Sequence, residues 1–116
     1  MTSEPGGDTG ATPLTLERSG TEQDPVISAR GEIDVATSPL LRSELTSVLA
    51  HEPERVTLDL DGVTFIDSSG LGVLVGALKR LREAGGEHFT VVNAQDSVRK
   101  VFDITGLSPL FELPEL

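Results

Sequence analysis

The sequence has no cysteine, tryptophan or tyrosine, and its only aromatic residues are four phenylalanines. Without cysteine it can form no disulfide, offers no thiol nucleophile and cannot build a zinc site of the cysteine type. Single-stranded nucleic acids bind on exposed aromatic rings, so an aromatic content of 3% argues against such a surface. The longest apolar run, residues 71–78, is far shorter than the roughly 20 residues that span a bilayer.

Positive charge is also scarce, because 9 lysines and arginines stand against 19 acidic residues and the net charge is −10. A chain of this sign repels nucleic-acid phosphates and anionic lipid surfaces, so we expect neither nucleic acid nor a membrane as a partner. The first ten residues lack both the basic start and the apolar core that are typical of a signal peptide. We therefore expect a cytoplasmic protein.

The length of 116 residues suits one domain with a single hydrophobic core. The first residues are mostly glycine, proline, threonine and acidic residues, which offer almost no apolar surface to bury. Residues 1–13 are therefore predicted to form a disordered N-terminal tail, and residues 14–116 to form the domain.

The periodicity of apolar residues predicts the elements of this domain. Alternation indicates strands near 14–16 and over 27–33, 55–61 and 89–92, with an optional further strand at 110–113, while helical spacing indicates helices from Ser38, over 70–83 and over 98–105. Residues 62–69 are predicted to be a connection in which Val63, Phe65 and Ile66 are buried. Strand–helix–strand units imply parallel pairing, and the short first connection implies an antiparallel pair. We therefore predict an α/β domain with a mixed, mostly parallel sheet of four to five strands and helices packed on it.

The segment 63–72 places a carboxylate and two hydroxyls, those of Asp67, Ser68 and Ser69, at the head of a predicted helix. One interpretation is helix capping, in which Asp67 or Ser68 accepts hydrogen bonds from the first free N–H groups. The other is an anion site, since the same N–H groups and the helix dipole favour a phosphate, including one attached to Ser69. The residues alone leave both interpretations open.

Asp34 ends the second predicted strand and is expected at the same edge of the sheet as Ser69. It has two interpretations of its own. The first is a loop carboxylate that caps the next helix near Thr37 and Ser38. The second is a functional group beside Ser69, and the sequence pattern does not decide between them.

Enzyme signatures are missing from the sequence. There is no phosphate-binding loop with its lysine and no nucleophile elbow around Ser68. The two histidines, His51 and His88, are predicted to be surface residues, and they are too few and too far apart in sequence to indicate a metal site. We predict no catalytic residues, no cofactor and no metal.

Four segments together resemble the STAS domain, and more narrowly the bacterial anti-sigma factor antagonists. They are Gly31-Glu32-Ile33-Asp34, Leu58-Asp59-Leu60, the run from Val63 through Asp67-Ser68-Ser69-Gly70-Leu71 to Gly72, and the run from Val101 through Gly106 to Leu107. The resemblance covers about residues 14–113.

The resemblance implies a switchable binding protein with no catalytic activity. In that family the hydroxyl residue before Gly-Leu, here Ser69, is phosphorylated by a partner that is both anti-sigma factor and serine kinase. The unphosphorylated form binds this partner and frees the sigma factor, the phosphorylated form lets go, and a separate serine phosphatase resets the switch. The resemblance also implies that the surroundings of the phosphorylation site and the partner-binding residues are Asp34, Asp67, Ser68, Gly70 and Leu71.

Two departures from the family pattern stand at the ends of the chain. The acidic residues 1–13 have no clear counterpart, and the chain ends soon after Leu113, where relatives often carry a further helix. Two alternatives to sigma-factor control are a STAS module of another signalling complex, coupled to a sensor or transporter, and a small hydrolase or nucleotide-binding protein that uses the Ser69 loop.

Overall fold

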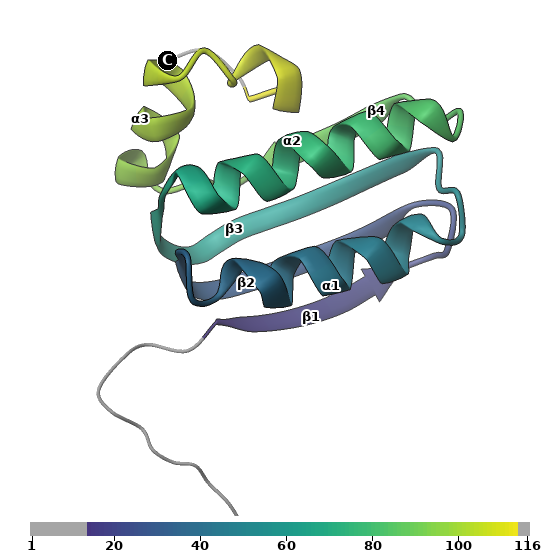
Figure 1. Ribbon diagram of the computed structural model, residues 1–116, viewed down its shortest axis with the longest axis horizontal. Coiled ribbons are helices and arrows are strands. Elements are labelled where there is room, and N and C mark those ends of the chain that lie inside the picture. Colours follow the sequence, from purple (N-terminus) through teal and green to yellow (C-terminus); the bar gives the residue numbers. More distant parts are fainter. Residues whose placement is uncertain (1–13, 114–116) are drawn as a thin grey trace, which may run out of the picture.

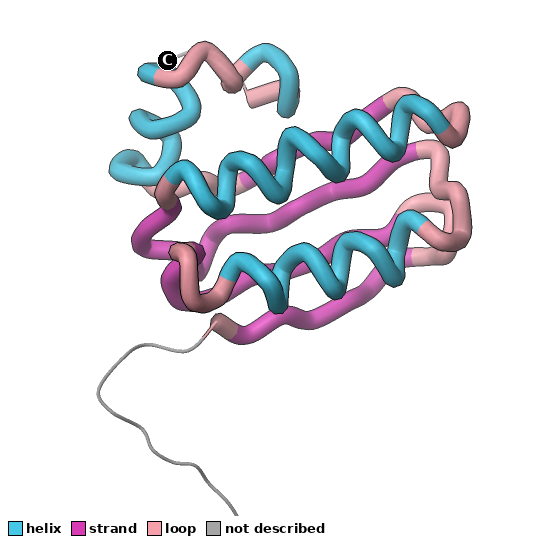
Figure 2. The backbone as a smooth tube through the Cα atoms, in the orientation of Figure 1, coloured by secondary structure: helices cyan, strands magenta, loops and turns pink. Residues whose placement is uncertain are grey.

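The computed structural model describes residues 14–113, so the predicted tail over residues 1–13 lies outside the described residues. The described elements are β1 (Thr15–Gly20), β2 (Pro25–Ile33), α1 (Ser38–Leu49), β3 (Arg55–Ile66), α2 (Ser68–Glu83), β4 (His88–Val92), α3 (Asp96–Ile104) and a short 3-10 helix, η1 (Pro109–Phe111). Figure 2 shows strands and helices alternating along the chain after the first hairpin.

The four described strands form one sheet in the order β1-β2-β3-β4. β1 pairs antiparallel with β2, whereas β2 with β3 and β3 with β4 are parallel. The predicted α/β class, with a mixed and mostly parallel sheet, is confirmed. The parallel register places Ile33 of β2 beside Ile66 of β3, so these two strands end together at one edge of the sheet.

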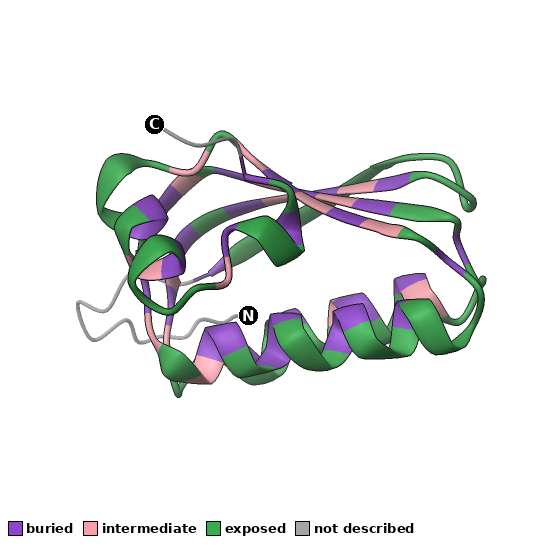
Figure 3. Ribbon diagram, turned by 90° about the horizontal axis from the view of Figure 1, so that it is seen from above, coloured by how far each residue is buried: buried purple, intermediate pink, exposed green. Residues whose placement is uncertain are grey.

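α1 and α2 lie side by side on one face of the sheet (Figure 1). Viewed from above, their buried residues face the strands and their exposed residues face away (Figure 3). Leu41 and Leu45 of α1 and Leu74 and Leu81 of α2 are all fully buried, which confirms the predicted helical spacing of the apolar residues. No helix in residues 14–113 is long and apolar enough to cross a membrane.

β3 is longer than predicted, because it continues through the expected connection to Ile66. Its buried positions are 56, 58 and 60, then 63 and 66, so the two-residue alternation breaks twice. The pairing with β2 shifts register over the same stretch, where Gly62 lies opposite Arg30. Because irregular pairing disrupts the alternation of apolar and polar residues, that alternation does not predict this part of the strand. It also turns Phe65 outward, 46% exposed, so the prediction that Phe65 is buried is wrong, whereas Val63 and Ile66 are buried as predicted.

The C-terminal part of the described chain corrects a second prediction, because residues 109–111 form the 3-10 helix η1 and not a strand over 110–113. Pro109 lacks an N–H for a sheet ladder, and Glu112 has a left-handed backbone with φ 59°. Phe111 packs edge-on against Phe89 at 5.3 Å and Phe102 at 5.8 Å between ring centroids. η1 is thereby anchored in the core beside β4.

Candidate functional site

The carboxyl ends of β2 and β3 bring together the two segments that the sequence singled out. Asp34 follows Ile33 and Asp67 follows Ile66, and the N–H of Asp67 donates a hydrogen bond of 3.2 Å to the carbonyl oxygen of Ile33. The turn before α1 and the start of α2 accordingly lie together at one end of the molecule (Figure 1). This edge of an α/β sheet is where such folds generally present functional groups.

Asp67 is the N-cap residue of α2 and has an extended backbone. Its Oδ1 accepts hydrogen bonds from the N–H groups of Ser69, at 2.9 Å, and Gly70, at 3.4 Å. A carboxylate in this place satisfies two otherwise free donors and complements the positive end of the helix dipole. The capping interpretation is therefore confirmed for Asp67. The helix begins at Ser68, two residues earlier than predicted.

Ser68 and Ser69 occupy the first turn of α2, so both are held by a helix and not by a loop. Ser68 is exposed and Ser69 is half-buried. Within residues 14–113 no hydrogen bond engages the Ser69 hydroxyl, because only its backbone N–H is used, by Asp67. A hydroxyl that is partly accessible and not needed for capping can be modified without breaking a structural contact.

Gly70 and Leu71 face the core. A Cβ added to Gly70 would lie 2.5 Å from Cγ2 of Ile33 and 2.9 Å from Cγ1 of Ile66, which is closer than van der Waals contact allows. Leu71 is buried beside it. These two residues let α2 sit directly on the ends of β2 and β3. They fix the position of Ser69. Because they face the core, side chains able to contact a partner belong to the neighbouring residues.

The carboxylate of Asp34 stabilises the turn in which it lies. Its Oδ1 accepts hydrogen bonds from the N–H groups of Ala36 and Thr37, both at 3.0 Å, and from the Thr37 hydroxyl at 3.2 Å. Its backbone carbonyl accepts the N–H of Ser38 at 2.8 Å. Asp34 is thus a loop carboxylate that stabilises its own turn, but it does not cap α1, which has no side-chain cap hydrogen bond; a functional role beside Ser69 stays a prediction. Thr37 precedes α1 as its N-cap residue, and Ser38 is a buried first residue of the helix.

Sequence reasoning missed the apolar residues that surround this end of the sheet. Val35 is 74% exposed in the turn after β2, Leu40 is 49% exposed in the first turn of α1, and Phe65 is exposed near the end of β3. A valine inside an otherwise polar turn was the available signal. Exposed apolar side chains gathered at one end of a sheet form a surface suited to a protein partner.

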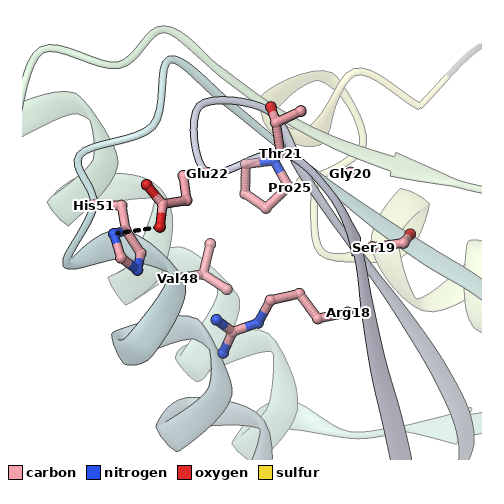
Figure 4. A pocket seen from close by; sticks show the side chains of 8 residues that line it. All are labelled: Arg18, Ser19, Gly20, Thr21, Glu22, Pro25, Val48 and His51. Atoms are coloured by element: carbon pink, nitrogen blue, oxygen red, sulfur yellow. Dashed lines mark ion pairs between the residues drawn. The ribbon is translucent and has the colours of Figure 1, made fainter.

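The opposite end of the molecule carries the histidines. His51 lies at the rim of a cavity of about 210 Å³ between the β1–β2 hairpin and the end of α1, with Arg18 and Val48 also lining it (Figure 4). Its Nδ1 is 3.7 Å from Oε2 of Glu22. Both His51 and His88 are more than one third exposed, as predicted for surface residues. No group of three or more potential metal ligands occurs in the described part of the chain.

The chain matches the family model described as STAS domain over residues 15–115. It is 36% identical to the anti-sigma-B factor antagonist of Bacillus subtilis over 100 residues, which are 86% of this chain and 90% of that protein. Among solved structures, an anti-sigma factor antagonist from Mycobacterium paratuberculosis is 32% identical with a TM-score of 0.76, covering 89% of this chain and 87% of that one. The anti-sigma factor antagonist SpoIIAA in its unphosphorylated form is 25% identical with a TM-score of 0.70, covering 82% and 84%.

These relatives are regulatory proteins and not enzymes, so the alternative of a small hydrolase or nucleotide-binding protein is set aside. The family model covers residues 15–115, a range that includes the edge of the sheet that carries Ser69. The chain belongs to the STAS domain family, among the anti-sigma factor antagonists.

Proposed function

We propose that this protein binds an anti-sigma factor that is also a serine kinase, and that phosphorylation of Ser69 ends the binding. In the unphosphorylated state the protein holds the anti-sigma factor and leaves the sigma factor free. A serine phosphatase restores the unphosphorylated form, and this protein acts in the cytoplasm. The observation that carries the proposal is the Ser69 hydroxyl, which lies half-buried in the first turn of α2 and makes no hydrogen bond within residues 14–113.

The names of relatives support the same switch. The Bacillus subtilis relative is named for antagonism of an anti-sigma-B factor, and SpoIIAA has been solved in both an unphosphorylated and a phosphorylated form. A relative of this chain therefore exists in a phosphorylated form, and Ser69 is the residue of this chain that matches the family pattern for the phosphorylated hydroxyl.

The geometry indicates how a phosphate would act. Phosphorylation adds about −1.5 to −2 charges at neutral pH. The N–H groups of Ser69 and Gly70 already bind Asp67, so a phosphate could use them only by displacing that carboxylate. It would instead add charge and bulk close to Asp67, at the edge of the sheet where Val35 and Phe65 are exposed. A charge placed in a desolvated apolar contact weakens binding without refolding the domain.

Mass spectrometry tests the acceptor residue. The protein is incubated with ATP and candidate anti-sigma kinases, and the intact mass is expected to rise by one phosphate, located on Ser69 by fragmentation. Ser69→Ala is expected to abolish the gain, and Ser68→Ala, the matched control next to it, to leave it unchanged. Full labelling of Ser69→Ala would move the assignment to Ser68 or Thr64. Because Asp67 and not Ser69 is the cap, Ser69→Ala should keep the melting temperature of the parent.

Affinity measurements test the switch itself. The phosphorylated protein is expected to bind the anti-sigma factor about a hundredfold more weakly, which corresponds to about 2.7 kcal/mol. Ser69→Asp should reproduce part of this loss, because it supplies a single carboxylate in place of a phosphate. Amide spectra of the two forms should differ near the start of α2 and the turn after β2 only. Equal affinity of both forms would contradict the proposal.

A further inference from the structure

A second surface lies along the later half of α2, away from Ser69. It is a groove of about 390 Å³ between α2 and η1, lined by Val75, Leu78, Lys79, Arg82, Glu83 and Leu110. Val75 is 39% exposed and Leu110 is 40% exposed, so apolar side chains on both walls meet solvent. α1 flanks α2 on its other side, and α3 and η1 lie beyond the groove (Figure 1).

The rim of this groove carries two cations, Lys79 and Arg82, against one carboxylate, Glu83, so it is locally positive on a strongly acidic protein. Lys79 and Arg82 form no ion pair within residues 14–113, where the ion pairs of basic side chains involve Arg18, His51, His88 and Arg99. The sequence has only 9 lysines and arginines against 19 acidic residues. Two unpaired cations beside exposed apolar walls are complementary to a segment that carries both apolar and acidic side chains.

The spacing of the wall residues defines the shape of the occupant. The lining residues of α2 recur at intervals of three to four residues, so they form a straight stripe of about 10 Å along the helix. They are Val75, Leu78 or Lys79, and Arg82. Two turns of a helix that presents apolar residues at the same intervals would match this stripe. We propose that the groove between α2 and η1 docks an acidic, amphipathic helix of a partner protein.

A second copy of this chain suits the groove less well, because its described helices already bury most of their apolar residues in their own core. The groove is also separate from the phosphorylation site. Val75 and Arg82 follow Ser69 by 6 and 13 residues, or roughly 9 and 20 Å along the helix. Docking there is therefore expected in both states of Ser69, and it does not depend on the function proposed above.

Amide spectra of the full chain test the groove with defined probes. The first probe is a synthetic helical peptide with leucine at every third or fourth position and glutamate on its polar face, and the second replaces each glutamate with lysine. The acidic peptide is expected to shift resonances of residues 75–83 and 109–111, equally for the parent and for Ser69→Asp. The basic peptide is expected to bind at least about tenfold more weakly.

Charge reversal provides the matched variants. Lys79→Glu with Arg82→Glu is expected to weaken binding of the acidic peptide at least about tenfold, whereas Arg30→Glu with Lys100→Glu, which changes net charge equally elsewhere, is expected to leave most of the affinity. Val75→Ser tests the apolar wall in the same way. Failure of the acidic peptide to shift these resonances, or equal binding by both peptides, would overturn the proposal. Two further results would overturn the proposal. One is self-association of the parent protein that Val75→Ser abolishes, and the other is a shift of the groove resonances when residues 114–116 are removed.

Discussion

β2 and β3 end in the same way, but the chain continues differently after each strand. Ile33 and Ile66 are paired and buried, and each is followed by an aspartate. Asp34 folds its carboxylate into a turn, and α1 starts four residues later without a side-chain cap. Asp67 caps α2 itself, so that helix starts at the very next residue.

Because of this difference, Ser69 lies on a rigid element and Val35 lies on an adaptable turn. Ser69 is carried on a helix that is seated directly on the sheet through Gly70, so its location is fixed before any partner arrives. Val35 lies on a turn and presents an apolar side chain that is 74% exposed. The molecule thus combines a serine hydroxyl on a rigid element with an exposed apolar side chain on a turn, and binding groups often occupy loops that a rigid scaffold positions.

The largest expected effect comes from a substitution that disrupts the close packing of α2 on the sheet. Gly70→Ala would place a methyl group 2.5 Å from Cγ2 of Ile33, and the resulting overpacking is expected to cost about 1–3 kcal/mol. Gly72→Ala is the matched control in the same helix, because a Cβ there meets nothing within 4 Å. Better helix propensity should make that variant up to about 1 kcal/mol more stable than the parent. Urea unfolding measures both, and similar effects of the two substitutions would contradict the tight seating of the helix.

The next effect compares the two aspartates directly. Asp67→Ala removes the cap of α2 and is expected to cost about 1 kcal/mol, whereas Asp67→Asn retains an accepting oxygen and should cost much less. Asp34→Ala is expected to cost less than Asp67→Ala, because the backbone bonds from Thr37 and Ser38 to the carbonyl of Asp34 remain. Thermal unfolding of the three variants checks this order. A larger loss for Asp34→Ala would mean that the turn, and not the helix cap, stabilises this end of the molecule.

The sequence predicted the parts of this comparison that depend on local chemistry. Apolar spacing identified most of the strands and helices, and Asp67 was one of the two residues named as a possible cap of α2. Local chemistry also ends α3, because Gly106 has φ 77° and the following Leu107 N–H is bonded to the Phe102 carbonyl.

The remaining features depend on contacts between distant segments. The register that joins Ile33 to Ile66 is a tertiary feature, and so is the irregular pairing that extends β3 and turns Phe65 outward. Helical spacing predicts that Leu71 is buried, but the close approach of Gly70 to Ile33 and Ile66 follows from where α2 meets the sheet, which motif spacing does not encode. The functional roles of the site residues stay predictions.

The smallest expected effect contrasts these strand-end aspartates with Glu112, a carboxylate beside the start of β4. Asp34 and Asp67 accept hydrogen bonds from neighbouring N–H groups, whereas Oε2 of Glu112 lies 2.6 Å from Nδ1 of His88 and its Oε1 accepts the Thr90 hydroxyl at 3.0 Å. The hydrogen bond from His88, above all, lowers the pKa of Glu112 below its usual 4.5. A carboxyl group whose pKa is lower in the folded state stabilises the fold above its unfolded pKa, and this stabilisation is lost as the pH falls through the folded pKa.

The contribution of the Glu112 pair is expected to be less than about 1 kcal/mol, because both side chains are more than one third exposed and solvent screens them. His88→Ala removes the main cause of the lowered pKa, so the measurement compares parent and variant by urea unfolding at about pH 6 and about pH 3. The parent should be slightly more stable at the higher pH, and the gap should narrow as the pH falls and Glu112 becomes protonated. Ala substitution of His51, which pairs with Glu22 at the looser distance of 3.7 Å, is the control and should show a smaller change. A gap that stays constant with pH would assign the role of His88 to packing and not to the ionised carboxylate.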